Sequence, residues 1–238
     1  MPDKLQRSLN ETLNEVRAWL EDLRALGLDE VQVADLLELH PCPPDVIGLD
    51  RGGYGDCRQE TLEEIRVDLG DCQRCPLCAT RNHLIFGAGS VTSRIVFVGG
   101  AATRGEENSG HPLAGELFDH ILFAMGFSRA TIFSCQVVMC HPPQRQVRTE
   151  EIASCLPFLQ RQIAVISPKV IVTLGEVATR ALIAQTGDFS MLRGHWATYR
   201  GIDVMPTFDP AYLLLHPQEK REAWNDLKEV LRKIRSDD

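Results

Sequence analysis

The sequence has no long apolar run. No stretch of about 18 consecutive apolar residues occurs in its 238 residues, which argues against a membrane-spanning helix. Residues 1–16 form a charged helical pattern without the apolar segment of a secretory signal, so we expect no signal peptide. Internal repeats and low-complexity tracts are absent as well. The apolar and charged fractions of the chain are those of an ordinary soluble globular protein.

No second, separate Cys-x-x-Cys pair is present outside the overlapping run Cys72-x-x-Cys75-x-x-Cys78, although the chain has eight cysteines. Eight cysteines without a secretory signal favour a reducing cytoplasm and metal ligation over a disulfide framework. We therefore expect a cytoplasmic protein.

Four of the cysteines form a pattern that indicates a metal centre. Two form a Cys-x-x-Cys pair, a third follows more than sixty residues later in Cys-His-Pro-Pro, and the fourth stands alone: Cys72, Cys75, Cys140 and Cys155. A zinc ribbon would have two separate Cys-x-x-Cys knuckles, and only one such segment is present. A pair completed by two isolated cysteines fits an iron–sulfur cluster better.

Negative charge is concentrated in the N-terminal part. The net charge is −8, but residues 1–71 hold 7 Lys and Arg against 17 Asp and Glu, a balance of −10. Residues 72–238 hold 18 against 16, a balance of +2. A nearly neutral main domain can still carry a local basic face, and local charge governs contacts with phosphates. The charge is therefore compatible with DNA binding without indicating it.

The chain is predicted to consist of two parts. Residues 1–55 predict an acidic helical extension with a linker, and residues 56–238 predict the main domain. Leucines recur at helical spacing within residues 4–27, and Pro and Gly are frequent in residues 40–57. We expect the helix to pack on the main domain or on a partner chain, where it could also mediate self-association.

Beyond residue 93, short β-rich runs alternate with amphipathic helical stretches. The expected strands are at residues 95–98, 131–138, 170–174 and 202–207. The expected helices are at about 115–126, 149–167, 176–186 and 218–235. This alternation predicts an α/β fold, a three-layer αβα sandwich around a central, mainly parallel four-stranded sheet. Because ligands of such sheets bind outside the carboxyl ends of the strands, we expect the chemistry in the segments 99–115, 136–145, 175–180 and 207–216.

A series of motifs in these segments occurs in the order of a known family. They are Cys72-Gln-Arg-Cys-Pro-Leu-Cys with Arg81, Arg94-Ile-Val-Phe-Val-Gly-Gly, Gly110-His-Pro-Leu-Ala-Gly, Val137-Val-Met-Cys-His-Pro-Pro, Glu151-Ile-Ala-Ser-Cys-Leu-Pro-Phe-Leu, Pro168-Lys-Val-Ile-Val-Thr-Leu-Gly, Arg193-Gly and Asp209-Pro-Ala-Tyr-Leu-Leu. On these motifs, about residues 60–235 resemble the family 4 (iron–sulfur) uracil-DNA glycosylases of the uracil-DNA glycosylase superfamily.

The resemblance implies an activity, a cofactor and a partner. The activity is that of a DNA glycosylase in base excision repair, which hydrolyses the N-glycosidic bond of a flipped uracil or another damaged or modified base in DNA. The cofactor is a [4Fe–4S] cluster held by Cys72, Cys75, Cys140 and Cys155. The remaining cysteines are expected to be bystanders or inert thiols: Cys42, Cys57, Cys78 and Cys135.

The base pocket of the family is altered in this chain. Gly100 stands where the family has a glutamate that helps to shape the pocket. Leu113 replaces the aromatic that stacks on the flipped base, and Gln136 replaces the Asn that reads the pyrimidine edge. Asp209 replaces the His of the last motif, while an acidic family position is kept as Glu106.

The resemblance also assigns roles to these positions. Glu106 and Asp209 are predicted to be catalytic. Glu106 would position or activate water or stabilise the sugar cation, and Asp209 would contact the base or act as the acid or base group. Base binding is predicted at Gly100, Ala101, Leu113 and Gln136, and DNA binding at Arg193, Leu213, Leu214, Leu215 and His216. The leucines could wedge into the gap left by the flipped base.

Structural roles for the same residues remain open. Glu106 could be a solvated loop charge, Asp209 a cap before Pro210, and Gln136 an ordinary polar residue at a strand end. The leucines at 213–215 could belong to the core at the start of a helix.

The changed pocket predicts a change in base choice. A departing uracil carries negative charge, which an ionised Asp209 would repel, so uracil excision should be weak unless Asp209 is protonated or His111 or His216 takes over. An ionised carboxylate instead accepts well from an exocyclic amine. Since Leu113 is smaller than an aromatic residue, we hypothesise a substrate base with an amino group or a bulky modification. Two alternatives are a catalytically weakened homologue that binds DNA without base excision, and an interaction module that recruits a partner.

Overall fold

The computed structural model describes residues 60–143, 145–183 and 187–236. The predicted extension in residues 1–55, with Cys42, lies outside the described residues, and so does Cys57. The division of the chain at residue 55, the binding of a partner through the extension and the cytoplasmic location therefore stay predictions. Within the described ranges, no helix has both the length and the apolar character needed to cross a membrane.

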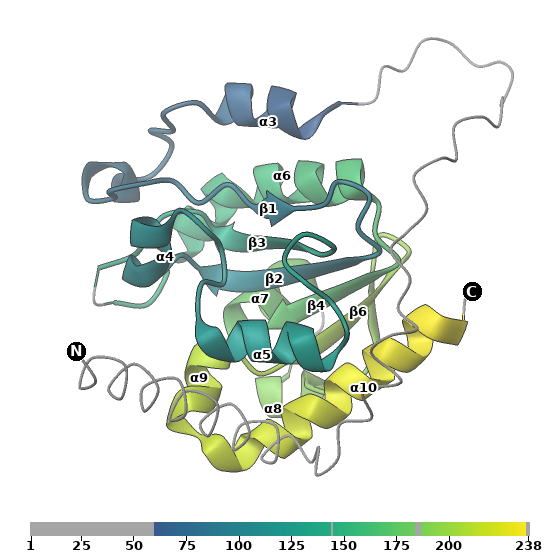
Figure 1. The fold of residues 1–238 in the computed structure, drawn as a ribbon. Helices are drawn as coiled ribbons and strands as arrows, with labels where there is room; N and C mark the ends of the chain where they lie inside the picture. Colours follow the sequence, from purple (N-terminus) through teal and green to yellow (C-terminus); the bar gives the residue numbers. More distant parts are fainter. Residues whose placement is uncertain (1–59, 144, 184–186, 237–238) are drawn as a thin grey trace, which may run out of the picture.

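A six-stranded sheet forms the middle layer of the molecule (Figure 1). Its strand order is β1-β3-β2-β4-β6-β5, with the bounds Ala88–Gly89 (β1), Ile95–Ala101 (β2), Phe133–Val138 (β3), Val170–Leu174 (β4), Ala197–Tyr199 (β5) and Ile202–Thr207 (β6). The strands β2, β3, β4 and β6 are parallel to one another, and β1 and β5 pair antiparallel at the two edges. The predicted α/β fold with its mainly parallel sheet is confirmed.

The sheet has two strands more than the predicted four. β1 has two residues and β5 has three. Such short segments are too brief to show the alternation by which a strand is found in a sequence. The four predicted strands are the parallel ones, and their residues are almost all buried on both faces, as in β4, where every residue is buried. Strands covered on both faces appear in the sequence as continuous apolar runs.

Helices cover both faces of the sheet and complete the three predicted layers (Figure 1). Their bounds are Leu62–Leu69 (α3), Arg104–Ser109 (α4), Glu116–Ala124 (α5), Thr149–Ile166 (α6), Gly175–Leu182 (α7), Phe189–Leu192 (α8), Pro210–Leu215 (α9) and Lys220–Ser236 (α10), with 3₁₀ turns at Pro76–Ala79 (η1) and Pro217–Glu219 (η2). α5, α9 and α10 pack on one face, and α6 and α7 pack on the other.

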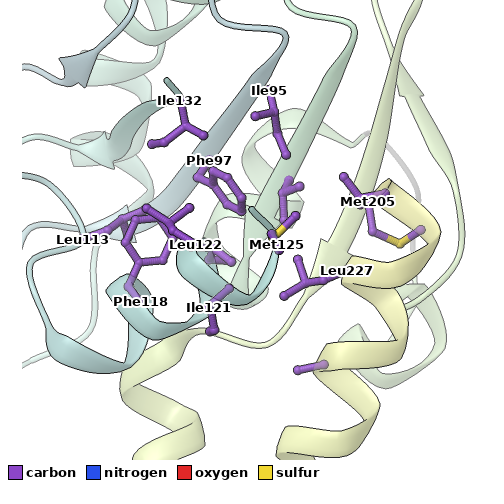
Figure 2. Packing of buried hydrophobic residues seen from close by; sticks show 14 of the residues in the cluster. Ile95, Phe97, Leu113, Phe118, Ile121, Leu122, Met125, Ile132, Met205 and Leu227 are labelled. Carbon is purple, nitrogen blue, oxygen red and sulfur yellow. The ribbon is translucent and has the colours of Figure 1, made fainter. Parts of the chain in front are cut away.

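The core on the α5 side reaches the edge of the predicted site (Figure 2). Phe97 of β2 meets Phe118 of α5 edge to face, with ring centroids 5.3 Å apart. Leu122 and Met125 fill the space beside them, and Leu113 closes this cluster at the end nearest the pocket. The pocket is therefore built directly on a close-packed core.

Two short helices that were not predicted bring the candidate catalytic carboxylates to the same edge of the sheet. α4 follows β2, and its N-cap is Thr103, which forms a capping box with Glu106. α9 follows β6, and its N-cap is Asp209, with Pro210 at the first helical position. Both helices begin beyond the carboxyl ends of parallel strands, where ligand sites of such sheets lie.

Candidate active site and cysteine cluster

A cavity of about 280 Å³ lies at the carboxyl ends of β2 and β3. Most of the predicted catalytic and base-binding residues line it, together with one leucine of α9: Ala101, Glu106, Leu113, Gln136, Asp209 and Leu214. The fold thus gathers residues from five separate segments of the chain around one concave site, which is the usual form of a ligand pocket. We refer to this cavity as the base pocket.

Glu106 is buried in the first turn of α4. Its Oε2 accepts from Thr103 N at 2.6 Å, and its own backbone N–H donates to the Thr103 hydroxyl at 3.2 Å. Only 3 % of Glu106 is exposed, so the alternative of a solvated loop charge is wrong. Burial raises the pKa of Glu106, and hydrogen bonds from Thr103, Leu113 and Gln136 partly oppose this shift.

Gln136 is bonded to Glu106 across the base pocket. Its Nε2 donates to Glu106 Oε1 at 2.8 Å, whereas its Oε1 is buried without a hydrogen-bond partner. An ionised carboxylate can only accept, so the amide nitrogen must face Glu106 and the oxygen must face away from it. An unpaired buried acceptor costs about 1–3 kcal/mol. A hydrogen-bond donor on a bound ligand could remove that cost.

Gly99 provides the space that the Gln136 and Leu113 side chains occupy. A Cβ at this position would lie 2.7 Å from Leu113 Cδ2 and closer still to Gln136 Oε1. Leu113 itself has a positive φ of 53°, which is unusual for a residue with a bulky side chain. Its carbonyl accepts from Arg129 Nη2 at 2.8 Å, and its N–H donates to Glu106. Backbone strain that neighbours hold in place in this way is typical of ligand sites.

Gly100 does not line the base pocket, which corrects its predicted role in binding the base. Successive residues of a strand face opposite sides of the sheet. Gly99 faces Gln136, so Gly100 faces α7, where a Cβ would lie 3.0 Å from Val177 Cβ. Ala101, one position further on, returns to the pocket side and lines the cavity.

Asp209 caps α9 and lines the base pocket at the same time. Its Oδ1 accepts from Ala211 N at 2.7 Å, so Asp209 has the capping role that was the structural alternative to a catalytic one. Burial raises the pKa of Asp209, and the backbone hydrogen bonds from Ala211 and Tyr212 lower it in part. Neither His111 nor His216 lines this cavity, so neither is placed to replace the family's histidine.

The three leucines of α9 have different environments. Leu213 is 1 % exposed and belongs to the core, which argues against its predicted role as a DNA wedge. Leu214 and Leu215 are exposed, and Leu214 lines the base pocket. His216 stacks on Tyr212 with ring centroids 4.2 Å apart. The exposed side of α9 therefore presents two leucines and a stacked ring pair, and their contact with DNA stays a prediction.

Arg193 is engaged within the protein. Its Nη1 donates to both carboxylate oxygens of Asp226 at 2.9 Å, and its Nη2 donates to Glu222 at 2.8 Å. The guanidinium also lies over the Phe208 ring, 5.0 Å from its centroid. Because α10 neutralises its charge, this placement argues against the predicted DNA contact and assigns Arg193 a structural role.

The four predicted cluster ligands gather at one end of the molecule. Cys72 and Cys75 lie at the start of η1, Cys140 follows β3, and Cys155 lies in the first half of α6. Burial is the main cause of the raised pKa of the Cys75, Cys140 and Cys155 thiols, and charge on the neighbouring thiols raises these pKa values further. Such mutual effects require the four sulfurs to be near neighbours.

The environment of these thiols fits a cationic metal centre. Burial raises the pKa of Cys140 to about 12, although Arg81 lowers it in part, and that of Cys155 to about 11, so neither would be a thiolate at neutral pH without a bound metal. In the part of the chain that the structure describes, no three Cys, His, Asp or Glu side chains are arranged to hold a single metal ion. An iron–sulfur cluster binds each cysteine at a different iron, so it accepts sulfurs that are farther apart.

Two arginines point at the cysteine sulfurs. Arg74 Nη1 lies 3.6 Å from Cys72 Sγ, and Arg81 Nη1 lies 3.9 Å from Cys140 Sγ. Sequence reasoning assigned neither of them a role, although Arg81 belongs to the motif that begins at Cys72. Cys78 is partly buried near Cys75, and Cys135 is fully buried in the core.

Gly99 is a further residue at the site that sequence reasoning missed. The Gly-Gly pair at the end of β2 was the only signal for it, and the alternation of the strand decides which glycine faces the pocket.

Comparisons with known proteins identify the family of the chain. Residues 86–228 match the model of the uracil DNA glycosylase superfamily. A type-4 uracil-DNA glycosylase of Thermotoga maritima is 34 % identical over 180 residues, which cover 73 % of this chain and 91 % of the relative. Type-4 uracil-DNA glycosylases of Sulfurisphaera tokodaii and Archaeoglobus fulgidus are 32 % and 30 % identical, over 72 % of this chain and 84 % and 92 % of the relatives. The chain therefore belongs to the uracil DNA glycosylase superfamily, among the relatives of its type-4 members.

Proposed function

We propose that this protein is a DNA N-glycosylase that holds a flipped base in the base pocket and hydrolyses its glycosidic bond. The activity of the superfamily and of the type-4 relatives supports this proposal. The cavity is supported by a close-packed core, and its polar lining includes Glu106, Gln136 and Asp209. In the reaction the sugar carbon gives up the bond to the base nitrogen, the base leaves with the electron pair, and water adds to the sugar.

The observation that carries the proposed base choice is the unpaired Oε1 of Gln136. Because Glu106 accepts from the amide nitrogen, the oxygen of the amide is left as an unpaired acceptor at this position. A base with an N–H or an amino group at its edge would satisfy that acceptor, whereas a carbonyl there would not. Uracil also has an N–H, between its two carbonyls, so the preference for an amino-bearing base requires in addition that an ionised Asp209 accept where uracil has a carbonyl.

Asp209 can take either of two roles, and its protonation decides between them. Its pKa is raised by burial, which favours the protonated form relative to a free aspartate. A protonated Asp209 would donate to the leaving base and favour its departure, as preorganised donors do. An ionised Asp209 would accept from an amino group. In both states its bond to the backbone of Ala211 keeps the carboxyl group at the start of α9.

Glu106 is better placed to orient Gln136 than to activate water. One of its oxygens accepts from the Thr103 backbone and the other accepts from Gln136. Both oxygens are therefore already hydrogen-bonded. The role on the sugar cation predicted from the sequence stays a prediction.

The cysteines would hold a [4Fe–4S] cluster, with Cys72, Cys75, Cys140 and Cys155 as ligands. Burial of these thiols and the two arginines beside them support this assignment. When bound, the cluster would supply a covalent link between three segments that are distant in sequence. DNA with a damaged or modified base is the proposed partner, with Leu214, Leu215 and His216 as contacts.

A second candidate is a homologue that binds DNA without excising a base. The buried Leu113 favours this candidate, because a side chain packed into the core has little surface on which a flipped base could stack. The replacement of the family's histidine by Asp209 favours it as well.

Single-turnover assays on duplexes containing uracil, 5-modified cytosines or damaged purines would test the proposal. We expect excision of a base with an amino group to exceed that of uracil, and Gln136→Leu to remove this difference. Asp188→Asn, an exposed change outside the pocket, is the control for Asp209→Asn. Preference for uracil would contradict the proposed base choice. Equal DNA binding by wild type and Asp209→Asn, with no base excised, would favour the second candidate.

A further inference from the structure

We propose that Arg81 is a positioning residue of the cysteine cluster, which it holds together and whose negative charge it balances. Arg81 would thereby determine how firmly iron is retained and at which potential the cluster is reduced. This inference rests on the cluster assignment and does not depend on which base the protein excises.

The contacts of Arg81 join the two halves of the ligand set. Its Nη1 donates to the backbone carbonyl of Cys72 and lies 3.9 Å from Cys140 Sγ. Its Nη2 donates to Asp71, and its backbone N–H donates to Leu77 O at 3.0 Å. One guanidinium thus connects the loop that carries Cys72 with the end of β3, where Cys140 lies.

The Arg81 side chain is buried, so its charge acts strongly on the nearby sulfurs. Its side chain is 8 % exposed, whereas the side chain of its ion-pair partner Asp71 is 86 % exposed. Water screens the carboxylate much more than the guanidinium, so Asp71 leaves most of the positive charge for the sulfurs. Arginine stays protonated at all working pH values. The thiolates are therefore next to a permanent buried cation.

A donor to a cluster sulfur acts on both iron retention and redox behaviour. Outer-sphere hydrogen bonds orient the metal ligands, and their loss typically costs 10–100-fold in metal affinity. Hydrogen bonds to the sulfurs and the local charge also set the reduction potential of iron–sulfur clusters. Reduction adds one negative charge, which a nearby cation stabilises. Removal of the cation should therefore make the potential more negative.

Arg74 is a matched control on the same cysteine pair. Its Nη1 lies 3.6 Å from Cys72 Sγ, yet its side chain is 42 % exposed and also donates to the carbonyls of Asp68 and Leu69. Its guanidinium also lies over the Phe158 ring of α6, 4.7 Å from the centroid, but its hydrogen bonds go to one segment only. Because solvent screens its charge, Arg74→Gln should change the cluster much less than Arg81→Gln.

The test uses full-length protein purified without oxygen, as wild type, Arg81→Gln, Arg81→Lys and Arg74→Gln. Iron and sulfide per chain, the rate of iron loss to a ferrous chelator and the midpoint potential from a visible and EPR titration are measured. We expect Arg81→Gln to lose iron 10–100-fold faster than wild type and to have a more negative potential. Arg81→Lys keeps the charge, so its potential should stay near that of wild type although it loses iron faster. Arg74→Gln should resemble wild type in both measurements.

Each other outcome also decides the question. Wild-type rates and potentials in Arg81→Gln would overturn the role of Arg81 and leave the cluster assignment intact. Absence of iron and sulfide in wild type would overturn the cluster assignment itself. If Arg81→Gln retains no iron but has the circular dichroism spectrum of wild type, recovery of iron in Arg81→Lys would support the proposal. Loss of iron in Arg74→Gln to the same extent would contradict it.

Discussion

At the scale of single residues, the chemistry of the pocket depends on the direction in which one amide faces. Gln136 can present either a donor or an acceptor, and only its bond to the Glu106 carboxylate selects the acceptor. The carboxylate is itself oriented by its capping box with Thr103. The base preference of the pocket therefore depends on Glu106, which acts by orienting Gln136.

Replacement of Glu106 by Gln should weaken base discrimination. A glutamine keeps the capping box but can both donate and accept, so the Gln136 amide is no longer held in one orientation. Hydrogen bonds to charged groups contribute about 1.5–3 kcal/mol, so we expect the ratio of excision rates for amino-bearing and carbonyl-bearing bases to fall about tenfold or more. Glu116→Gln, which removes an exposed carboxylate at the rim of the same cavity, should leave the ratio unchanged. An unchanged ratio in both variants would refute the orienting role.

Replacement of Gly99 by Ala should close part of the base pocket. The added methyl group would collide with the Gln136 and Leu113 side chains, and overpacking of this kind typically costs about 1–3 kcal/mol. We expect a lower free energy of unfolding and a higher KM for DNA. Gly105→Ala is the matched control, because its Cβ would meet no atom closer than 3.8 Å and it lies within α4, where alanine stabilises a helix by about 0.5–1 kcal/mol. Equal stability of the two variants would contradict the predicted collision.

Replacement of Asp209 by Asn should change the pH dependence of stability. Asn caps helices about as well as Asp, so the bond to Ala211 survives while the buried charge is lost. The pKa of Asp209 is raised in the folded protein, so ionisation of this carboxyl group destabilises the fold. This destabilisation is absent below the unfolded pKa of about 4, where the group is protonated in both states. Wild type should therefore lose stability relative to Asp209→Asn as pH rises from that value through the raised pKa. Thermal unfolding of both proteins between pH about 4 and 8 would measure this, and parallel curves would show that Asp209 does not titrate in that range.

At the scale of secondary structure, the sequence predicts the longer elements, which have strong patterns. It misses two short helices whose only sequence signal is the capping residue at their start. The four parallel strands and the helices α5, α6, α7 and α10 follow from apolar runs and helical spacing. α4 and α9 have only six residues each, too few for a periodic pattern. The Thr103–Glu106 capping box and the Asp209-Pro210 pair were the signals that could have located them.

The leucines of α9 should separate stability from DNA recognition. Leu213 is buried, so Leu213→Ala should lower the free energy of unfolding by about 2–5 kcal/mol. Leu215 is 79 % exposed, so Leu215→Ala should leave stability nearly unchanged. If Leu215 fills the gap in the duplex, this variant should excise more slowly from double-stranded DNA than wild type, with equal rates on single strands. Equal rates on both substrates would eliminate the wedge.

At the scale of the whole molecule, the sequence predicts which residues share a site better than it predicts the direction in which they face. The cysteine spacing and the strand ends indicate two separate clusters, and the fold assembles both. The role of Gly100 could not be resolved, because neighbouring positions of β2 point to opposite layers. The role of Arg193 could not be resolved either, because its partners are on a helix about thirty positions later in the chain.

Removal of the cluster should affect one end of the molecule and spare the sheet. The central strands lie between two large cores, of which the one on the α6 side includes Cys140 and Cys155, whereas α3 joins the rest of the domain through α6, where Arg161 pairs with Glu60 and Asp68. After iron is removed by a chelator, we expect hydrogen exchange to increase in residues 60–90 and to stay slow in β2 and β4. Uniform loss of protection would mean that the cluster is needed for the entire fold.

The two neighbouring glutamates of α4 have a further consequence. Glu107 accepts from Asn82 N at 3.2 Å, directly after Arg81, whereas Glu106 holds the Gln136 amide. Adjacent residues of one short helix therefore contact the segment beside the cysteines and the Gln136 side chain in the base pocket. A shift of that segment after loss of iron would move α4 and release Gln136. The choice of base would then report whether the protein carries its metal.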